Sequence, residues 1–540
     1  MVATQAKEYN VHMLRWNGYG DETITLPLSE SARVYFSQIL GSAERPQDVD
    51  RASVMIPPSQ LLSNPHALLH FDDELRLRHA LGQSFPDLAA KRFGSISRFP
   101  DAVAFPESDE EVVDLLAWAR TAGAQVIPFG GGTSVVGGVN PLKREEDDRP
   151  VVTISLARLN DLRNLNETSQ LATFGAGTLG PYVEAQLRAH GFTLGHYPQS
   201  FEYSSLGGWV ATRSSGQQSL GYGRIESLFA GGTIETPSGR IMLPPMPASA
   251  AGPDLRHLIL GSEGRLGIIT EATVRVRRLP EIESFYGVMF PDWITGIKAA
   301  REAMQSGIPL SMMRFSNPTE TETFLHMPAH QGSVELLRSL LRWKNFTAEK
   351  CLMLFGITGG KRLAKMARRA MLDLTHEHHG LWLNEAIGNQ WAKTRFRSAY
   401  LRDTLWEHGY AVDTLETAVT WDMVPQASQI ILQALADAVA PVLPMVHLSH
   451  FYRDGASLYF SFLFRVGVTM EATMLRWQAL KEAGSQAVMA VGGTISHQHG
   501  VGLDHRPYLE QEKSKLGIEV LKDVQRFLDP LGIMNPGKLM

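Results

Sequence analysis

Val126-Ile127-Pro128-Phe129-Gly130-Gly131-Gly132-Thr133-Ser134 is an apolar run that leads directly into a glycine-rich loop. The apolar residues predict a buried strand. In the loop the backbone can approach a ligand closely, because no side chains intervene, and successive N–H groups can converge on an anion such as a pyrophosphate. A strand followed by such a loop is the context that a phosphate site requires, although the triplet alone is equally typical of a plain turn.

The sequence on both sides of this loop predicts alternating strands and helices. Residues 102–105 form an apolar strand pattern, and Ser108 with Glu111 gives the S-x-x-E arrangement of a capping box before a helix. Gly123 occupies the position where a left-handed C-cap residue is expected. Further strands are predicted at 151–154 and 171–174, and a further helix at 180–190.

Three more loops rich in glycine and hydroxyl groups follow in the same region, at 198–208, 212–216 and 261–270. Each of them could be a turn if it stood alone. Four such loops in one domain instead indicate a large cofactor, because a long ligand needs backbone donors along its whole length.

The length, net charge and cysteine content of the chain restrict the classes of protein to which it can belong. A chain of 540 residues exceeds the length at which one hydrophobic core stops growing, so two or more domains are expected. The formal net charge of −5 argues against non-specific nucleic-acid binding. Cys351 is the only cysteine, which excludes an intramolecular disulfide and a cysteine-ligated iron–sulfur cluster and fits a reducing compartment.

Targeting signals are not apparent in the sequence. Residues 1–10 are polar and lack the apolar segment of a secretory signal, and no run of roughly 18 apolar residues predicts a transmembrane helix. The final residues, 537–540, differ from the Ser-Lys-Leu peroxisomal address. We therefore expect a cytoplasmic protein. The acidic stretch from Lys143 to Arg149 is predicted to be a solvated turn.

The four loops, in this order, resemble the FAD-binding domain of the vanillyl-alcohol oxidase and p-cresol methylhydroxylase superfamily. Within that superfamily, residues 128–135, 195–200 and 207–213 are similar to the alkyldihydroxyacetonephosphate synthase family. The resemblance implies an α+β fold with a two-subdomain FAD-binding domain of the vanillyl-alcohol oxidase type and an α+β cap domain for substrate. The implied boundaries are 1–93 for a mostly helical N-terminal segment, 94–280 for the FAD-binding domain, 281–490 for the cap, and 491–540 for an active-site loop and return segment.

FAD is the cofactor that the resemblance implies, with its pyrophosphate on Gly130 to Ser134 and its ribityl and isoalloxazine parts on the other loops. Covalent relatives carry a histidine in the first glycine loop, where this chain has glycine, threonine and serine, so non-covalent FAD is expected. The residues expected to contact FAD are Pro128, Gly130, Gly131, Gly132, Thr133, Ser134, His196, Gln199, Ser200, Ser204, Ser205, Gly208, Thr212, Arg213, Ser215, Glu263, Gly264, Gly267, Ile268 and Ile269.

Two functions share this FAD domain, and the C-terminal half must distinguish them. D-2-hydroxyacid dehydrogenases, such as D-lactate dehydrogenases, carry H-x-G-D-G-N-x-H and S-G-E-H-G stretches that suit a divalent metal. In this chain Tyr459 and Gln498 replace two of those probable ligands. His450 and His499 remain and could bind a metal only with help, so dehydrogenation stays open as the alternative, whereas the synthase resemblance implies no metal.

The synthase resemblance places a catalytic base on Tyr459, within Asp454 to Phe460. Its histidine triplet falls on His497, Gln498 and His499, so the middle residue departs from the pattern, and the resemblance implies that His497 and His499 are catalytic together with Tyr459. Its two phosphate-binding arginines fall on Arg314 and Arg402. Read from the residues alone, Tyr459 could be an ordinary strand tyrosine, the histidines loop residues, and the arginines members of surface ion pairs. The chemistry is nevertheless coherent, because arginine forks suit a phosphate and proton removal needs a positioned base.

The reaction that the resemblance implies is replacement of the acyl chain of acyl-dihydroxyacetone phosphate by a long-chain fatty alcohol, with no net redox change. This exchange is the flavoenzyme transferase step of ether-lipid synthesis. The implied partners are these small lipid substrates, with peripheral membrane contact and a homodimer as further expectations. No nucleic-acid partner is expected.

Overall fold

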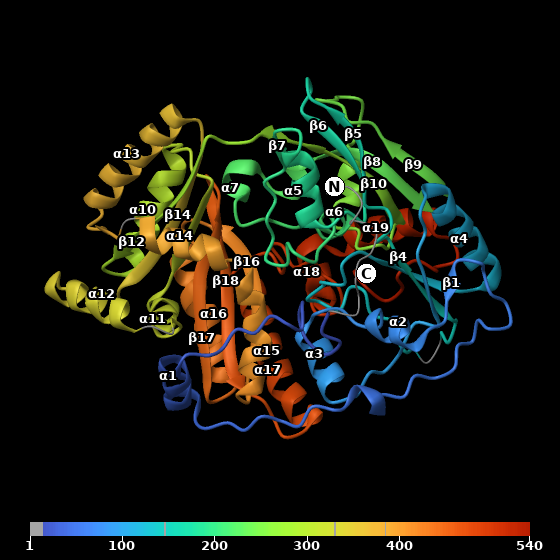
Figure 1. Cartoon of the computed structure of the whole chain (residues 1–540), viewed down its shortest axis with the longest axis horizontal. Coiled ribbons are helices and arrows are strands. Elements are labelled where there is room, and N and C mark those ends of the chain that lie inside the picture. Colours follow the sequence, from blue (N-terminus) through green and yellow to red (C-terminus); the bar gives the residue numbers. More distant parts are fainter. Residues whose placement is uncertain (1–13, 145–146, 329–330, 384) are drawn as a thin grey trace.

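The computed structural model describes residues 14–144, 147–328, 331–383 and 385–540, so Glu145 and Glu146 of the predicted turn lie outside the described residues. Two lobes lie side by side in Figure 1. The first, which we call the FAD lobe, is built on two small sheets, and the second, the cap lobe, is built on one seven-stranded sheet. Helices pack on both lobes, and the predicted α+β class is confirmed.

The first sheet of the FAD lobe contains the glycine loop at its edge. Its order is β1-β2-β4-β3, in which β2, β4 and β3 are parallel. The helix α4 between β2 and β3 begins after Ser108, whose side chain accepts from the N–H of Glu111, and ends at Gly123 in the left-handed region at φ 65°. The capping box is only half formed, because the Glu111 carboxylate accepts from Glu107 instead of Ser108. The bounds are β1 Leu69–His70, β2 Ala102–Ala104, α4 Asp109–Ala122, β3 Gln125–Phe129 and β4 Val151–Ser155.

The second sheet of the FAD lobe is antiparallel, in the order β5-β6-β10-β8-β9. Both sheets share one apolar core, to which Val126, Phe174 and Ile268 contribute. The bounds are β5 Leu162–Asn166, β6 Leu171–Gly175, α5 Gly180–Arg188, β7 Phe192–Thr193, α6 Leu206–Thr212, α7 Ser219–Tyr222, α8 Ile225–Leu228, β8 Phe229–Thr236, β9 Gly239–Leu243, α9 Arg256–Ile259, β10 Ile268–Arg275 and β11 Arg277–Arg278.

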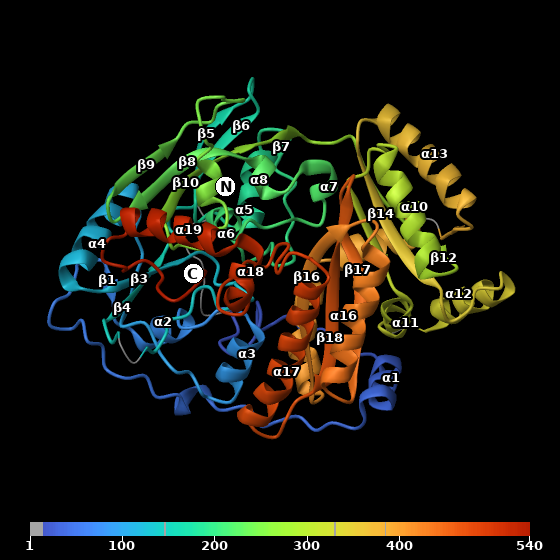
Figure 2. The same ribbon diagram turned by 180° about the vertical axis from the view of Figure 1, so that it is seen from behind.

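The cap sheet is antiparallel throughout, in the order β15-β12-β14-β13-β17-β18-β16. Four helices, α10, α13, α16 and α17, bury one of its faces in a large apolar cluster; α16 and α17 lie in front of the sheet in Figure 2. The bounds are β12 Ile282–Phe290, α10 Trp293–Gln305, β13 Met312–Ser316, α11 Pro318–His326, α12 Gly332–Trp343, β14 Cys351–Gly359, α13 Lys361–Glu377, β15 Leu381–Trp382, α14 Glu385–Thr394, α15 Leu401–Glu407, β16 Tyr410–Thr420, α16 Val424–Ala438, β17 Val442–Phe451, β18 Gly455–Arg465 and α17 Met470–Ala490.

The two ends of the chain tie the lobes together. Helix α1 (Glu30–Leu40) packs on the other face of the cap sheet, against Leu443 and Leu463, and is followed by α2 (Asp73–Arg78) and α3 (Phe85–Arg92). After α17 the chain forms α18 (Leu509–Lys513) and α19 (Lys515–Leu528), and α19 lies over the FAD lobe in Figure 2. Met534 then pairs in parallel with Val126 beside β3. None of the described helices has the length and apolar character that a membrane span requires.

Candidate active site

A row of polar side chains crosses the face of the cap sheet opposite those four helices, the face on which α1 also packs. Tyr459 of β18 lies opposite Glu416 of β16 on one side and opposite His447 of β17 on the other. Side chains alternate along a strand, so the neighbours Leu415 and Phe460 point to the opposite face, where they join the apolar cluster. The same alternation that builds the cap core therefore brings these polar groups together on the face that the four helices leave uncovered.

Arg314 joins this row from β13. Its Nη2 donates to Oε1 of Glu320 at 3.0 Å and lies 3.1 Å from Nδ1 of His447. Nδ1 of His447 is also 2.9 Å from the same Glu320 oxygen. The Arg314 Nε is buried and has no hydrogen-bond partner in the described protein. Arg314 is therefore held by a buried carboxylate yet keeps a free donor, which is unlike a solvated surface ion pair.

Tyr459 is packed between two imidazole rings. Its ring stacks on His447, with centroids 4.9 Å apart and planes 22° apart, and meets the ring of His499 edge-on at 5.5 Å. Burial raises the pKa of Tyr459 to about 12, although a hydrogen bond with Thr414 opposes the shift. The phenol is consequently neutral at physiological pH, and any role as a base requires a neighbour that takes its proton.

Glu416 and His497 form a hydrogen-bonded pair at the end of this row. Oε1 of Glu416 lies 3.0 Å from Nδ1 of His497 and also accepts from the hydroxyls of Ser449 and Ser457. Burial alone would raise the pKa of Glu416, but the nearby His497 opposes burial and lowers it well below the ordinary value of a glutamate. The second carboxylate oxygen is buried without a partner in the described protein, and His499 Nε2 lies 3.9 Å from it.

Arg224 connects this pair to the FAD lobe. Its Nη1 is 2.8 Å from Nε2 of His497, which is also 2.6 Å from the hydroxyl of Tyr452. Its Nη2 donates to the backbone carbonyls of His497 and Arg213. A guanidinium has no acceptor, so Nε2 of His497 must accept, and the ring proton then sits on Nδ1, facing Glu416. Both nitrogens of His497 are thereby satisfied, whereas among the described residues the ring of His499 has a 3.9 Å contact with Glu416 but no recorded hydrogen bond.

Three groups in this region could together hold a metal ion. Potential ligand atoms of Glu416, His450 and His497 all lie within 4.8 Å of one another. However, the permanently charged guanidinium of Arg224 is hydrogen-bonded to Nε2 of His497, and the other nitrogen of that ring is bonded to Glu416. Like charges at this separation disfavour a cation. His450 is itself bonded to Ser215 at 3.3 Å. The residues fit a neutralised hydrogen-bond network better than a metal centre.

Arg402 belongs to α15, which packs beside β16 in the cap lobe. Its Nη1 donates to the carbonyl of Gln83, and the N–H of Gln83 donates to the carbonyl of Ser134 in the first glycine loop. The Nε and Nη2 atoms of Arg402 are buried without partners among the described residues. The recorded contacts of Arg402 thus join it to the glycine loop, whereas those of Arg314 join it to the cap row.

The glycine loop is a backbone surface with free donors. Within the described residues, no hydrogen bond to protein is recorded for the N–H groups of Gly131, Gly132, Thr133 and Ser134. A Cβ atom at Gly131 would lie 1.6 Å from the carbonyl oxygen of Tyr203, so this glycine is required where the first and second loops meet. Four consecutive unpaired N–H groups are the donors that a pyrophosphate would take up.

The side chains of several other residues predicted to contact FAD are already bonded within the protein. Ser205 caps α6, and Ser204 accepts from the indole of Trp209. The remaining contacts pair His196 with Ser214, Gln199 with the Arg395 carbonyl, Thr212 with the Gly208 carbonyl, Arg213 with Glu226, and Glu263 with the N–H groups of Val501 and Gly502. Pro128 packs beside Gly264, Gly130 lies against Ser205, Gly267 lies against Glu235, and Ile268 and Ile269 begin β10. No side-chain contact is recorded for Ser200.

Sequence reasoning missed five residues that complete the network, namely Arg224, Glu320, Glu416, His447 and Tyr452. Glu416 stands in a strand that alternates like any half-buried strand. Arg224 and His497 are separated by 273 positions. Of these five residues, the sequence pointed only to Tyr452, because it lies in the stretch from His450 to Tyr459 that is compared with the dehydrogenase motif.

Comparison with known proteins identifies a protein family for each of the two lobes. Residues 100–243 match the FAD binding domain family, and residues 279–539 match the C-terminal domain of FAD linked oxidases. The chain is 31% identical to an alkyldihydroxyacetonephosphate synthase of Dictyostelium discoideum, covering 98% of this chain and 93% of that protein. A solved alkyldihydroxyacetonephosphate synthase structure aligns with a TM-score of 0.84 and 28% identity, covering 98% of this chain and 99% of that one.

Two more distant matches share the fold but carry the names of other enzymes. A solved p-cresol methylhydroxylase shares the fold, with a TM-score of 0.68 and 12% identity over 95% of this chain and 98% of that one. A probable mitochondrial D-lactate dehydrogenase of Danio rerio is 27% identical over 82% of this chain and 85% of that protein. The predicted two-part FAD-binding domain and cap are confirmed, and the likeness to D-lactate dehydrogenase is the weaker of the two functional matches.

Proposed function

The chain belongs to the alkyldihydroxyacetonephosphate synthase family, and on that premise we propose that it exchanges the acyl chain of acyl-dihydroxyacetone phosphate for a long-chain fatty alcohol. The observation that carries the proposal is the nearly full-length likeness to the Dictyostelium discoideum synthase, which includes the cap lobe. Such an exchange is a transfer with no net redox change, and it forms part of ether-lipid synthesis.

FAD is the cofactor of the chain, and the free N–H groups of Gly131 to Ser134 fit its pyrophosphate. When bound, FAD supplies an electron sink for the substrate carbon whose substituent is exchanged. Nothing in the first glycine loop offers a histidine for a covalent bond, which supports non-covalent binding. Many side chains of the other loops are already bonded within their own loop or to neighbouring segments of the protein.

We propose that Arg402 of α15 and Arg314 of β13, both in the cap lobe, bind the substrate phosphate. Each has a buried guanidinium donor without a protein partner, and an anion that accepted those donors would remove the cost of leaving them unpaired. Arginine suits this task because its planar fork contacts two oxygens at once.

Tyr459 is our proposed proton carrier, with His499 as the group that takes its proton. Tyr459 is neutral by virtue of its raised pKa, and the His499 ring lies against it. Burial lowers the pKa of His499, so this imidazole is neutral and able to accept. His497 is held on both nitrogens, so we propose that it shapes the site together with Glu416 and takes no proton from substrate.

A lipid substrate suggests where the protein meets a membrane. Helix α12 exposes Leu336, Leu340 and Trp343, with exposed fractions of 75%, 40% and 73%, and it projects at the edge of the molecule in Figure 1. Lys344 lies 4.5 Å from the Trp343 ring. Apolar side chains flanked by cations are typical of helices that lie in a membrane interface. We propose that α12 provides the peripheral contact; a homodimer stays a prediction from the resemblance alone.

The function is tested by supplying the FAD-loaded protein with acyl-dihydroxyacetone phosphate and a labelled fatty alcohol. We expect label in the lipid product, release of fatty acid, and unchanged flavin absorbance at the end of the reaction. A parallel anaerobic reaction offers D-lactate and other D-2-hydroxyacids. Flavin bleaching by a hydroxyacid, with no incorporation of alcohol, would refute the transferase and favour the dehydrogenase.

A further inference from the structure

One acidic side chain of the FAD lobe reaches the loop of residues 497–503, which we call the histidine loop. Glu263 lies in the turn before β10, and its carboxylate accepts from the N–H of Val501 and, at 2.7 Å, from the N–H of Gly502. His499 stands two residues before Val501. Glu263 therefore holds the backbone that directly follows His499.

The carboxylate of Glu263 is buried without the help of a cation. The residue is 8% exposed. Burial raises its pKa to about 7, the two N–H groups of the histidine loop oppose this shift, and no cation among the described residues contributes to it. A buried carboxylate costs free energy unless hydrogen bonds satisfy it. The two N–H groups are therefore what keeps this side chain in place.

The backbone of Glu263 is also unusual. Its φ is +50°, in the left-handed region that residues other than glycine seldom adopt. Glycine or asparagine would serve a simple turn better, because both tolerate that conformation more readily. Backbone strain of this kind persists where the surrounding structure requires it, and it is concentrated at functional sites. The side chain of Glu263 therefore has a role that outweighs its backbone cost.

Gly500 leaves room for the Glu263 carboxylate. It has φ +86°, and a Cβ atom there would lie 2.8 Å from Oε1 of Glu263. Any other residue at this position would have to push the carboxylate away and adopt a conformation that side chains disfavour. The glycine after His499 and the acid at 263 are thus fitted to each other.

The histidine loop is tied to the FAD lobe on both sides of this contact. Nη2 of Arg224 donates to the carbonyl of His497 at 2.8 Å, and the N–H of Leu503 donates to the carbonyl of Val136 at 2.7 Å. Glu263 holds the loop between these two points. Because Tyr459 belongs to the cap lobe, the approach of His499 to it depends on how the FAD lobe holds this loop.

The turn that carries Glu263 is itself fixed within the FAD lobe. The N–H of Glu263 donates to the carbonyl of Ala211 in α6 at 2.9 Å. A Cβ atom at Gly264 would lie 2.9 Å from Pro128 of β3, the strand that leads into the first glycine loop. Three of the predicted FAD loops therefore meet at this turn.

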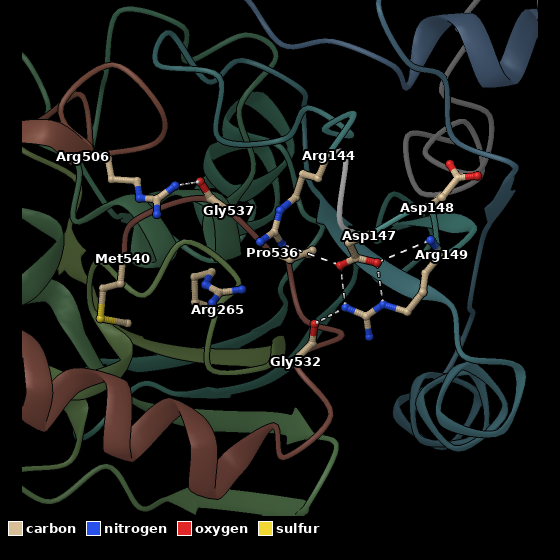
Figure 3. Close-up of a pocket in the computed structure, with 10 residues that line it drawn as sticks. All are labelled: Arg144, Asp147, Asp148, Arg149, Arg265, Arg506, Gly532, Pro536, Gly537 and Met540. Carbon is tan, nitrogen blue, oxygen red and sulfur yellow. Dashed lines mark hydrogen bonds and ion pairs between the residues drawn. The ribbon is translucent and has the colours of Figure 1, made fainter.

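The C-terminal segment holds the same turn. Arg265 donates to the carbonyl of Met534, and Nδ2 of Asn535 donates to the carbonyl of Glu263 at 2.7 Å. Figure 3 shows Arg265 in a pocket that residues 536 and 537 of this segment also line. The turn is thus fixed by several segments, and its position is passed to the histidine loop through Glu263.

We infer that Glu263 is a positioning residue of the proposed transfer, which fixes the histidine loop so that the ring of His499 lies against Tyr459. This inference rests on the proposed function, in which His499 takes the proton of Tyr459. The resemblance implied a contact between Glu263 and FAD, whereas each oxygen of its carboxylate already accepts an N–H of the histidine loop.

Amide hydrogen exchange of the FAD-loaded protein, followed by mass spectrometry, tests the contact without depending on the reaction. Glu263→Gln keeps the size of the side chain but replaces one acceptor oxygen by an NH2 donor. We expect a peptide spanning residues 498–505 to exchange faster by roughly tenfold or more, because hydrogen bonds to a charged group are lost. Glu184→Gln is the matched control: Glu184 accepts from the N–H groups of Leu194 and Gly195, and its loss should leave this peptide unchanged.

Turnover tests the positioning role. In Glu263→Gln we expect kcat to fall by roughly 10–100-fold with KM nearly unchanged, because misplacing a catalytic group is enough for such a loss. The same substitution made in His499→Gln should cost little more, because a residue that acts through His499 then has nothing left to position. An equal further loss in both backgrounds would mean a general structural role and would overturn the inference.

Glu263→Gly keeps the inference testable if Glu263→Gln does not load FAD, because glycine suits the backbone at φ +50°. We expect the same losses of exchange protection and turnover in this variant. Normal exchange and normal turnover would show that Glu263 only forms a turn. Unchanged exchange of the histidine loop overturns the inference whatever the activity. Faster exchange with no transfer by the wild type overturns the proposed function, and with it the catalytic part of this inference, while the contact itself stands.

Discussion

Nδ1 of His497 lies 3.0 Å from Oε1 of Glu416, a carboxylate on a residue that is only 1% exposed. On the other side of the imidazole, Arg224 reaches Nε2 from the FAD lobe. The carboxylate therefore balances the partly buried guanidinium of Arg224 through a neutral ring, and the line of three residues crosses from one lobe to the other. Nε of Arg224 also lies 3.8 Å from Glu226, so Arg224 keeps a carboxylate in its own lobe when Glu416 is changed, and the change should affect the site more than the fold.

Glu416→Gln should keep the shape of this line and remove its charge. We expect folding and FAD binding to survive, with turnover lower by roughly 10–100-fold, because hydrogen bonds to charged groups contribute about 1.5–3 kcal/mol. Steady-state kinetics and flavin content measure both effects. The control is Glu482→Gln on the exposed face of α17, where the carboxylate accepts a hydrogen bond from Gln486. A lower melting temperature with unchanged turnover would leave Glu416 a purely structural role.

Gly131→Ala should abolish most FAD binding. Its Cβ atom would lie 1.6 Å from the carbonyl oxygen of Tyr203, so the two loops must separate and the free N–H groups of the glycine loop lose their arrangement. Gly332→Ala is the matched control, since a Cβ atom there meets nothing within 4 Å. Flavin absorbance per polypeptide after purification gives the measurement. Full occupancy in Gly131→Ala would remove this loop from the cofactor site.

Arg402→Lys should weaken the phosphorylated substrate while leaving stability nearly unchanged. Lysine keeps the charge but loses the fork, and the two buried nitrogens without partners are the donors that would be lost. We expect KM to rise by roughly 10–100-fold, in line with the loss of one charge-assisted hydrogen bond. Arg45→Lys is the control, because Arg45 forms a half-exposed surface pair with Glu407. Equal KM values for both variants would place the phosphate elsewhere.

Asp504 provides a prediction about pH. Burial raises its pKa to about 7 against the opposing charge of Lys481, and its Oδ2 is buried without a partner among the described residues. The folded pKa is above the unfolded value of 3.8, so the unfolded chain loses this proton first, and stability falls as pH rises from about 4 to about 7. Asp504→Asn cannot ionise and escapes that loss.

The melting temperature of Asp504→Asn should therefore exceed that of the wild type at pH 8, and the difference should shrink toward pH 5. The expected gain at pH 8 is on the order of 1–3 kcal/mol, the usual cost of an unsatisfied buried polar group. Thermal unfolding of both FAD-loaded proteins at several pH values provides the measurement. A gap that does not change with pH would mean that Asp504 does not titrate in this range and would contradict the prediction.

Local sequence patterns correctly predicted the features that depend on neighbouring residues alone, such as helix ends and strand positions. Gly123 ends α4 in the left-handed conformation that its position indicated, and the strand before Gly130 carries the loop as expected. The need for glycine at 131 was also predictable, but its immediate cause is the backbone of Tyr203 in another loop. Contacts between loops depend on topology, which spacing along one segment does not encode.

The polar network could not be predicted in the same way. Glu416 and His497 are 81 positions apart, and their contact exists because β16 is an edge strand of the cap sheet beside the returning loop. His447 and Tyr459 stack only through the register of β17 against β18. The resemblance to the family pointed to Tyr459, His497 and His499. It could not show that both ring nitrogens of His497 are hydrogen-bonded while the ring of His499 makes only looser contacts with Tyr459 and Glu416.

Tyr459→Phe tests the centre of the proposed mechanism. Phenylalanine keeps the ring that stacks on His447 and removes only the hydroxyl, so FAD content should be normal and the melting temperature nearly so. If the phenol carries the proton from substrate to His499, turnover should fall by roughly 10²–10⁴-fold, the usual contribution of general acid–base catalysis. His499→Gln should show a comparable loss, and the double variant should be little worse than either single one, because both residues would serve one proton path. An ordinary strand tyrosine would instead lose on the order of 1 kcal/mol of stability with its hydrogen bond and keep its activity. Incorporation of labelled fatty alcohol is the assay, and near-normal incorporation by Tyr459→Phe would exclude this residue as the proton carrier.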